Sequence, residues 1–289
     1  MLILDALLFL LYINDLNDIV KEAISRLFAD DTAIHKRILK IQDCALVQKD
    51  LDALSVWEKR WDMSFHPDKC FVLSHSRKRE KSSTSYTLHG QVLSQVSSTD
   101  YLGVIVQDNG EWQEHINKIA TKGNQLLAFL KRNIKVNNIA VKAEAYQMLI
   151  RTPLEYASNV WDPHHQNEKD KLEKIQRRAA RFVLGDYRTT SSVTTMLDML
   201  KWPLLEDRRK DNRQKMLQKI LNNEVAVNHD NILKPATGRS RRSHPYQLKV
   251  IQCNRDYRNE SFFPRAIREW NAMPRDFQPR DPQQFFGTV

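Results

Sequence analysis

The chain has 289 residues, enough to bury a sizeable core and to form two or three domains. Its 41% hydrophobic and 28% charged residues, with only seven glycines and ten prolines, exclude a fibrous or disordered chain. Three scattered cysteines without a CxxC pair exclude a disulfide framework, argue against a zinc module and predict a reducing compartment, nuclear or cytoplasmic.

The net charge of +10 is unevenly distributed along the chain. Residues 1–107 contain 13 Lys and Arg against 14 Asp and Glu, whereas residues 108–289 contain 32 against 21. A basic second part is the electrostatic footprint of a polyanion such as nucleic acid, because each neutralised phosphate releases counterions. Ordinary solvated Lys and Arg faces would give the same composition, so both interpretations stay open.

The apolar run Leu2–Ile13 is expected to form a buried helix. It is shorter than the roughly 20 apolar residues that cross a bilayer. It also lacks the basic start and the small-residue cleavage site of a signal peptide. The sequence therefore predicts no membrane segment, and a helix is expected over residues 7–24.

Two short apolar segments flank a pair of aspartates within residues 25–35, which predicts a β-hairpin with Asp30-Asp31 as its turn. Apolar residues spaced three and four apart predict an amphipathic helix over residues 43–62. Further strands are expected at residues 70–73, 86–88, 90–92 and 98–106, with a polar surface loop over residues 74–85. This first part is predicted to be α+β with antiparallel strands.

From residue 112 the apolar spacing becomes helical, which predicts a mainly α-helical second part. Further helices are expected over residues 137–151, 168–184, 191–200, 204–222 and 264–272. The helix at 168–184 directs a row of basic side chains outward: Lys171, Lys174, Arg177, Arg178 and Arg181. A loop carries a second basic cluster: Arg239, Arg241 and Arg242.

Aromatic and histidine residues of the second part are weaker candidates for binding. Trp112, Trp161 and Trp202 could stack on bases, but packing in the core is the favoured interpretation. His164-His165 has no further ligand at metal-binding spacing and is interpreted as loop.

The Asp30-Asp31 pair is the first candidate for catalysis. Two carboxylates at a hairpin tip can hold Mg²⁺ when a third carboxylate and substrate phosphates complete the octahedron. Two such ions promote phosphoryl transfer. As an isolated string Ala-Asp-Asp is more often a solvated turn, so its interpretation depends on the motifs around it.

A series of motifs in a fixed order surrounds the pair. Phe28–Asp31 is similar to the [YF]-x-D-D hairpin of reverse transcriptases, and Leu7–Leu16 to the segment before it. Trp57–Lys69 resembles the palm motif that follows, and Tyr101–Val104 resembles the primer-grip hairpin. Residues 112–116, 154–161, 172–182 and 261–271 are similar to segments of the thumb and of the closing block. The series resembles the C-terminal portion of a non-LTR (LINE-type, jockey-like) retrotransposon reverse transcriptase over nearly the whole chain.

The resemblance implies a role for each catalytic candidate. Asp30 would be a ligand of the two Mg²⁺ ions that an RNA-directed DNA polymerase uses, and Asp31 its acidic neighbour with a lesser role. Lys69 would lie near the triphosphate, where a mobile ammonium can neutralise or protonate the departing pyrophosphate.

The resemblance also implies the partners and the domains. Tyr101, Leu102 and Gly103 would hold the primer 3′ end, and the basic helix would follow the backbone of an RNA template and DNA primer hybrid. Residues 1–107 would form a partial palm, residues 108–187 a helical thumb-like region, and residues 188–289 a basic helical C-terminal region.

The family's palm also needs an aspartate on a strand upstream of the hairpin, together with a fingers subdomain, and these residues match neither. We therefore expect weak or no Mg²⁺ binding and no processive DNA synthesis by the 289 residues alone. Two other interpretations stay open. One is a non-enzymatic nucleic-acid-binding protein that uses the basic helical half, and the other is a decayed element fragment without function.

Overall fold

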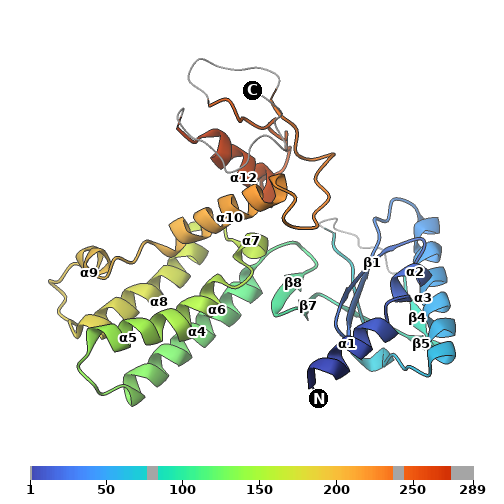
Figure 1. The fold of residues 1–289 in the computed structure, drawn as a ribbon, viewed down its shortest axis with the longest axis horizontal. Coiled ribbons are helices and arrows are strands. Elements are labelled where there is room, and N and C mark those ends of the chain that lie inside the picture. Colours follow the sequence, from blue (N-terminus) through green and yellow to red (C-terminus); the bar gives the residue numbers. More distant parts are fainter. Residues whose placement is uncertain (1, 77–83, 237–243, 275–289) are drawn as a thin grey trace. The chain divides into compact units, whose positions relative to one another are not determined.

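The computed structural model describes residues 2–76, 84–236 and 244–274, and the chain divides into two compact units, 1–111 and 112–289 (Figure 1). The first unit combines helices with short strands, and the second is mainly helical. This confirms the predicted mixed α and β class. The predicted basic loop with Arg239, Arg241 and Arg242 lies outside the described residues. No helix in the described ranges has the length and apolar character that crossing a membrane requires.

Two short helices, α1 (Leu2–Tyr12) and α2 (Leu16–Ile19), stand where one helix over residues 7–24 was predicted, so that prediction is wrong in its extent. The expected burial of this apolar run is also wrong, because four leucines of α1 are 48–72% exposed: Leu7, Leu8, Leu10 and Leu11. The chain turns between them, and there the carboxylate of Asp15 accepts hydrogen bonds from two indole N–H groups of α3 (Ile41–Trp61), a helix distant in the sequence. These are Trp57 Nε1 at 2.9 Å and Trp61 Nε1 at 3.1 Å. The turn therefore combines residues of low helix propensity, Asn14 and Asp15, with a tertiary contact that holds it.

The predicted hairpin is present as β1 (Ile24–Phe28) and β2 (Asp31–His35), which pair in an antiparallel register. Phe28 faces Asp31 across the pair, so the two-residue loop is Ala29-Asp30 and not Asp30-Asp31. Ala29 has a φ of 51°, in the left-handed region that the first position of a tight hairpin loop favours. The loop is therefore one residue earlier than predicted.

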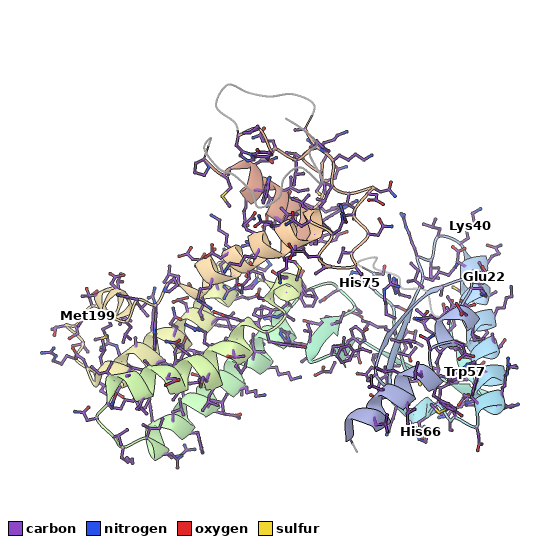
Figure 2. The ribbon with its side chains drawn as sticks, in the orientation of Figure 1. Glu22, Lys40, Trp57, His66, His75 and Met199 are labelled. Carbon is purple, nitrogen blue, oxygen red and sulfur yellow. The ribbon has the colours of Figure 1, made fainter. Side chains whose placement is uncertain are left out.

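Helix α3 (Ile41–Trp61) supports the hairpin from one side. Leu54 and Trp57 of α3 are buried in a cluster that also contains Ile13, Leu16 and Val20. Leu27 of β1 and Ile34 of β2 pack against this cluster with their inward faces. Figure 2 shows the side chains of this unit, with Trp57 on α3 and Glu22 just before β1. The hairpin is thus a two-stranded layer on a helical layer.

Within the described residues, the remaining strands of the first unit form three further two-stranded sheets. β4 pairs with β5 and β7 with β8 in the predicted antiparallel manner, but β3 and β6 pair in parallel. A short 3₁₀ turn, η1 (Pro67–Lys69), precedes β3. The strand bounds are β3 Phe71–Leu73, β4 Thr87–Leu88, β5 Gln91–Val92, β6 Ser94–Val96, β7 Ser98–Tyr101 and β8 Val104–Gln107.

The second unit is built around two long helices, α4 (Gln113–Asn133) and α8 (Gln166–Leu184). They approach closely at Gly123, where an added Cβ would lie 3.2 Å from Ile175 Cδ1 and 3.3 Å from Leu154 Cδ2. Trp161 and Trp202 are buried, which confirms their expected place in the core. The shorter elements are α5 Ile139–Tyr146, the π-helix η2 Gln147–Arg151, α6 Thr152–Glu155, α7 Ser158–Trp161 and α9 Val193–Met199.

A second cluster of this unit joins α10 (Leu205–Leu221) to α12 (Phe262–Asn271), which follows the single turn α11 (Asp256–Asn259). Buried ion pairs lie beside the cluster. Asp162 contacts Arg213 and lies 2.5 Å from Arg209 Nε, and Arg213 Nη2 lies 2.5 Å from Glu269 Oε1. Arg209 and Arg213 are 1% and 2% exposed. These pairs connect the end of α7 to α10 and α12.

Candidate active site and nucleic-acid interface

The Asp30 and Asp31 carboxylates lie at the tip of the β1–β2 hairpin, and both side chains are exposed. Asp30 is the second residue of the loop, and Asp31 is the first residue of β2. Phe28, across from Asp31, is 63% exposed on the face that points away from α3. The hairpin therefore presents two adjacent carboxylates, with their oxygens accessible from solvent.

A buried carboxylate on α3 fixes the base of this hairpin. Asp50, 2% exposed, accepts backbone hydrogen bonds from Lys21, Glu22 and Ala23 at 2.7–3.2 Å. These three N–H groups immediately precede β1 and have no strand partner of their own. Sequence reasoning missed Asp50, because a charged residue in the middle of an amphipathic helix is normally solvated.

Lys69 ends the η1 turn with its side chain exposed, and its ammonium makes no hydrogen bond or ion pair with any residue that the structure describes. The turn itself is held in two ways. Cys70 N donates to Pro67 O at 3.0 Å, and Gln91 Nε2 of β5 donates to Asp68 Oδ1 at 2.7 Å. An exposed cation therefore projects from a turn that is held in place.

The predicted primer-grip motif forms the tight turn between β7 and β8. Leu102 and Gly103 have φ values of 50° and 82°, and two successive positive values are typical of the hairpin turn that follows the twist of its strands. Asp100 Oδ1 accepts a hydrogen bond from Gly103 N at 2.9 Å. Ser76 N, beyond β3, donates to Asp108 O at 2.9 Å and so links this hairpin to the segment after Lys69.

All three predicted motifs lie in the unit 1–111, but the aspartate hairpin and the β7–β8 turn belong to separate two-stranded sheets, and Lys69 lies in the η1 turn before β3. β1 and β2 pair only with each other among the described strands. In the described part of the chain, no three His, Cys, Asp or Glu side chains form a group that could hold a metal ion. The structure thus presents the two aspartates, the lysine and the turn without joining them into one continuous sheet.

The basic face of α8 divides into three kinds of position. Lys174 and Arg177 are exposed. Lys171 Nζ donates to Asn117 Oδ1 at 2.9 Å, and Arg178 Nη1 donates to Asn124 Oδ1 at 3.0 Å, both across to α4. Arg181 instead donates to main-chain carbonyl oxygens of the turn after α8, at Asp186, Arg188 and Ser191. Four of the five predicted residues therefore keep their charge on the surface, and Arg181 holds the turn.

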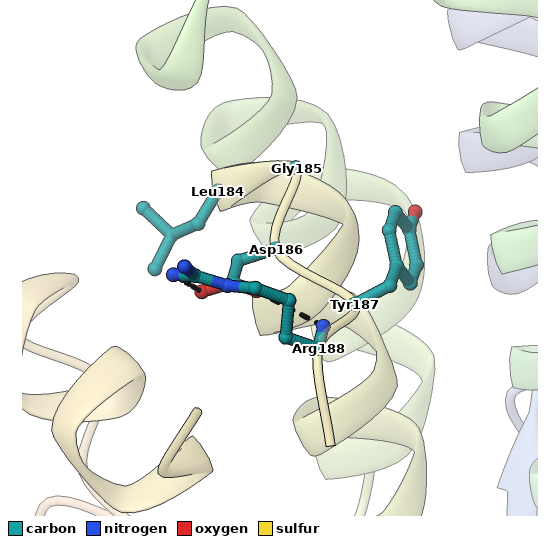
Figure 3. Close-up of a pocket in the computed structure, with 5 residues that line it drawn as sticks. All are labelled: Leu184, Gly185, Asp186, Tyr187 and Arg188. Carbon is teal, nitrogen blue, oxygen red and sulfur yellow. Dashed lines mark hydrogen bonds and ion pairs between the residues drawn. The ribbon is translucent and has the colours of Figure 1, made fainter. Parts of the chain in front are cut away.

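That turn forms a pocket of about 590 Å³ lined by Leu184, Gly185, Asp186, Tyr187 and Arg188 (Figure 3). The guanidinium of Arg188 and the hydroxyl of Ser191 hydrogen-bond the Asp186 carboxylate and hold its pKa well below the usual range. Tyr187 projects to the other side of the loop from Arg188. It is 58% exposed, and Lys131 Nζ of α4 lies 5.5 Å from its ring centroid.

Two RNA-directed DNA polymerases of mobile elements are similar to this chain. The polymerase from mobile element jockey of Drosophila funebris is 25% identical over 172 residues, which cover 57% of this chain and 18% of that protein. The probable polymerase from transposon X-element of Drosophila melanogaster is 22% identical over 191 residues, which cover 63% of this chain and 21% of that protein. The chain spans about a fifth of the length of these curated relatives.

The other two comparisons give no match. No family model matches the chain, and no solved structure matches it. The resemblance to non-LTR retrotransposon polymerases is therefore confirmed by sequence similarity that covers about three fifths of the chain.

Proposed function

We propose that this chain, which is similar in sequence to the RNA-directed DNA polymerases of non-LTR retrotransposons, supplies the Asp-Asp hairpin and the thumb of such a reverse transcriptase. The observation that carries the proposal is the hairpin itself. Asp30 and Asp31 are exposed at the tip of β1–β2, and buried Asp50 fixes the base of that hairpin. A rigid support with accessible carboxylates is what a metal-dependent site requires.

The donor set at the hairpin fits Mg²⁺ in kind but is incomplete. Carboxylate oxygens are the ligands that Mg²⁺ prefers, and Asp30 with Asp31 would provide two of them. When bound, a pair of such ions supplies the positive charge that favours attack by the primer hydroxyl and departure of pyrophosphate. Because two carboxylates give too few anionic ligands, a further carboxylate from elsewhere in the polymerase is needed to complete the site.

Lys69 would act on the leaving pyrophosphate, and the β7–β8 turn would act on the primer. The ammonium of Lys69, exposed on a held turn, can neutralise the leaving pyrophosphate or give it a proton. Tyr101, Leu102 and Gly103 would contact the primer near its 3′ end, where a turn with a fixed shape restricts the position of the attacking hydroxyl. In this proposal residues 1–107 are part of the palm, residues 108–187 the thumb and residues 188–289 the C-terminal region.

The nucleic-acid partner in this proposal is an RNA template paired with a DNA primer. Lys174 and Arg177 are exposed on α8. Such side chains neutralise phosphates without reading sequence, which is what a polymerase requires along its product. The Arg177→Gln and Lys174→Gln double variant should therefore weaken binding to a hybrid duplex and lower the salt dependence of that binding by about two phosphate contacts.

The catalytic part is tested by primer extension with a chimera in which this chain replaces the matching segment of the jockey polymerase. Asp30→Asn should abolish incorporation, and Asp31→Asn should reduce it less, because Asp30 is the proposed metal ligand. Asp18→Asn, at an exposed position of α2, is the matched control for loss of one negative charge. Full extension by the Asp30→Asn chimera would overturn the catalytic assignment.

The 289 residues tested alone should show no Mg²⁺-dependent extension, because the two aspartates need a further carboxylate. Incorporation by this chain that depends on both Mg²⁺ and Asp30 would contradict the expectation. It would mean that the missing ligand lies within these residues.

A further inference from the structure

Cationic side chains gather along the line where α4 and α8 lie side by side. Lys171 bonds Asn117, and seven residues further along both helices Arg178 bonds Asn124. Seven residues are two helical turns, or roughly 10.5 Å of rise. A third step on α4 leads to Lys131, whose ammonium lies 5.5 Å from the ring centroid of Tyr187. We name these four residues, Lys171, Arg178, Lys131 and Tyr187, the α4–α8 seam.

The positive charge of the seam is not neutralised within the described part of the chain. The hydrogen-bond partners of Lys171 and Arg178 are neutral amides, and neither these cations nor Lys131 forms an ion pair with a described carboxylate. Burial, and then the nearby charge of Arg178, lower the pKa of Lys131, so two cations lie close together. Like charges held together without an acid are stabilised by an external anion.

The seam ends at an exposed aromatic ring on a rigid support. Tyr187 is 58% exposed and lies in the turn that Arg181 fixes through three carbonyl oxygens. On the other side of the loop Arg188 is paired with Asp186, so the loop does not depend on Tyr187 for its shape (Figure 3). A ring in that position can stack on a base of any identity, because every base has a π-face.

We propose that the α4–α8 seam follows the sugar–phosphate backbone of the bound nucleic acid and that Tyr187 stacks on an unpaired base where the duplex ends. The inference rests on the nucleic-acid partner proposed above and specifies its form. The ligand is a duplex joined to a single-stranded overhang. Lys171, Arg178 and Lys131 neutralise phosphates of the duplex, and Tyr187 contacts the overhang.

The test measures binding of the full 289-residue chain to two fluorescent RNA–DNA hybrids of equal duplex length, one blunt and one with a single-stranded overhang. Tyr187→Ala should weaken binding to the overhang hybrid by roughly tenfold, the range measured for loss of one base–aromatic stack. It should change binding to the blunt hybrid less than about twofold, and Tyr187→Phe should bind both hybrids like the unchanged chain.

Matched controls exist for both parts of the seam. Phe129→Ala removes an exposed ring from α4, at a position about 120–160° around the helix from the seam at 100° per residue. Lys131→Gln with Arg178→Gln should weaken binding to both hybrids and flatten the salt dependence by about two phosphate contacts. Lys210→Gln with Lys215→Gln removes the same charge from exposed positions of α10 and should have the smaller effect.

The outcomes separate this inference from the proposed function. Suppose that Tyr187→Ala and the Lys131 and Arg178 double variant leave both affinities unchanged, while Lys174→Gln with Arg177→Gln weakens them. The proposed role of the seam is then wrong, and the proposed binding role of Lys174 and Arg177 is supported. If the unchanged chain binds neither hybrid, the proposed nucleic-acid interface fails as well. Binding to an acidic protein but to neither hybrid would identify the seam as a protein-docking surface and overturn the proposal.

Discussion

Three carboxylates, of which Asp50 is buried and Asp15 and Glu173 are partly buried, accept hydrogen bonds from other segments of the chain. Asp50 accepts four hydrogen bonds from three consecutive backbone N–H groups, which fixes the segment that leads into β1. Asp15 accepts from two indoles and sets the turn between α1 and α2. Glu173 of α8 accepts from the first residue of α10, Leu205 N, at 3.0 Å. Each carboxylate thus connects segments that are distant in the sequence.

Replacing Asp50 with alanine should destabilise the first unit, because three partly buried N–H donors lose their acceptor. Each unsatisfied buried donor costs about 1–3 kcal/mol, and partial rehydration lowers the sum, so we expect a loss of about 3 kcal/mol in the free energy of unfolding. Urea denaturation followed by tryptophan fluorescence measures it. Asp52→Ala, an exposed neighbour on the same helix, is the control, and equal effects of the two variants would contradict the role of Asp50.

Glu173 should make the stability of the second unit depend on pH. Burial raises its pKa, against the opposing influence of the hydrogen bond from Leu205 and the charges of Arg177 and Arg209. A pKa that is higher in the folded state than in the unfolded state means that the stabilisation is present at acid pH. It is lost as pH rises from about 4.3, the ordinary glutamate value, through the raised value.

The measurement compares the unchanged chain with Glu173→Gln between pH 4 and pH 7. The free energy of unfolding of the unchanged chain should fall relative to that of Glu173→Gln as pH rises, because the variant cannot ionise at this position. A difference between the two that stays constant over this range would show that burial does not affect ionisation of Glu173.

At the scale of elements, the spacing of apolar residues was sufficient to predict where the long helices lie. It was insufficient to predict how the elements are connected. α3, α8 and α10 lie within a few residues of their predicted ranges, because each has an apolar face of helical period. The hydrogen bonds from α3 to Asp15 that hold the turn after α1 were not predictable, since they join residues 42 and 46 positions apart in the sequence. The parallel pairing of β3 with β6 is also a tertiary choice that no local pattern indicates.

In the candidate site, too, some features were predictable from the sequence and others were not. The apolar segments around Asp30 and Asp31 predicted the aspartate hairpin, and the resemblance of Tyr101–Val104 to a known hairpin predicted the β7–β8 turn. The contacts of Asn117 and Asn124 with α8 were not predicted. Their seven-residue spacing matches that of Lys171 and Arg178, and this match is visible in the sequence. Tyr187 could not be found in this way, because its exposure depends on the turn that Arg181 holds.

The contact between α4 and α8 should be intolerant of added volume at Gly123. A Cβ there would lie 3.2 Å from Ile175 Cδ1, closer than ordinary van der Waals contact, and a branched side chain would need more room. We expect Gly123→Val to lower the free energy of unfolding by about 1–3 kcal/mol through overpacking. Thr121→Val, an exposed β-branched exchange on the same helix, should change it by less than about 0.5 kcal/mol.

At the scale of the whole molecule, each unit contains its own buried cluster. The first unit is organised around Leu54 and Trp57, and the second has a separate cluster that includes Leu217 and Trp270. The buried ion pairs of Asp162 with Arg209 and Arg213 lie entirely within the second unit. Domains that have their own core can in principle fold alone.

Residues 112–289 should therefore fold when produced without residues 1–111. The expected product has a helical far-ultraviolet circular dichroism spectrum and a cooperative thermal transition. It should also bind an RNA–DNA hybrid with an affinity within about threefold of that of the full chain, because the basic face of α8 lies in this unit.

Asp162→Ala in the same segment leaves Arg209 and Arg213 buried without that partner, and breaking such a pair costs about 3–5 kcal/mol. Loss of the transition in Asp162→Ala alone would confirm that these ion pairs hold the unit together. Absence of a transition in the unchanged segment would show that the second unit needs the first in order to fold.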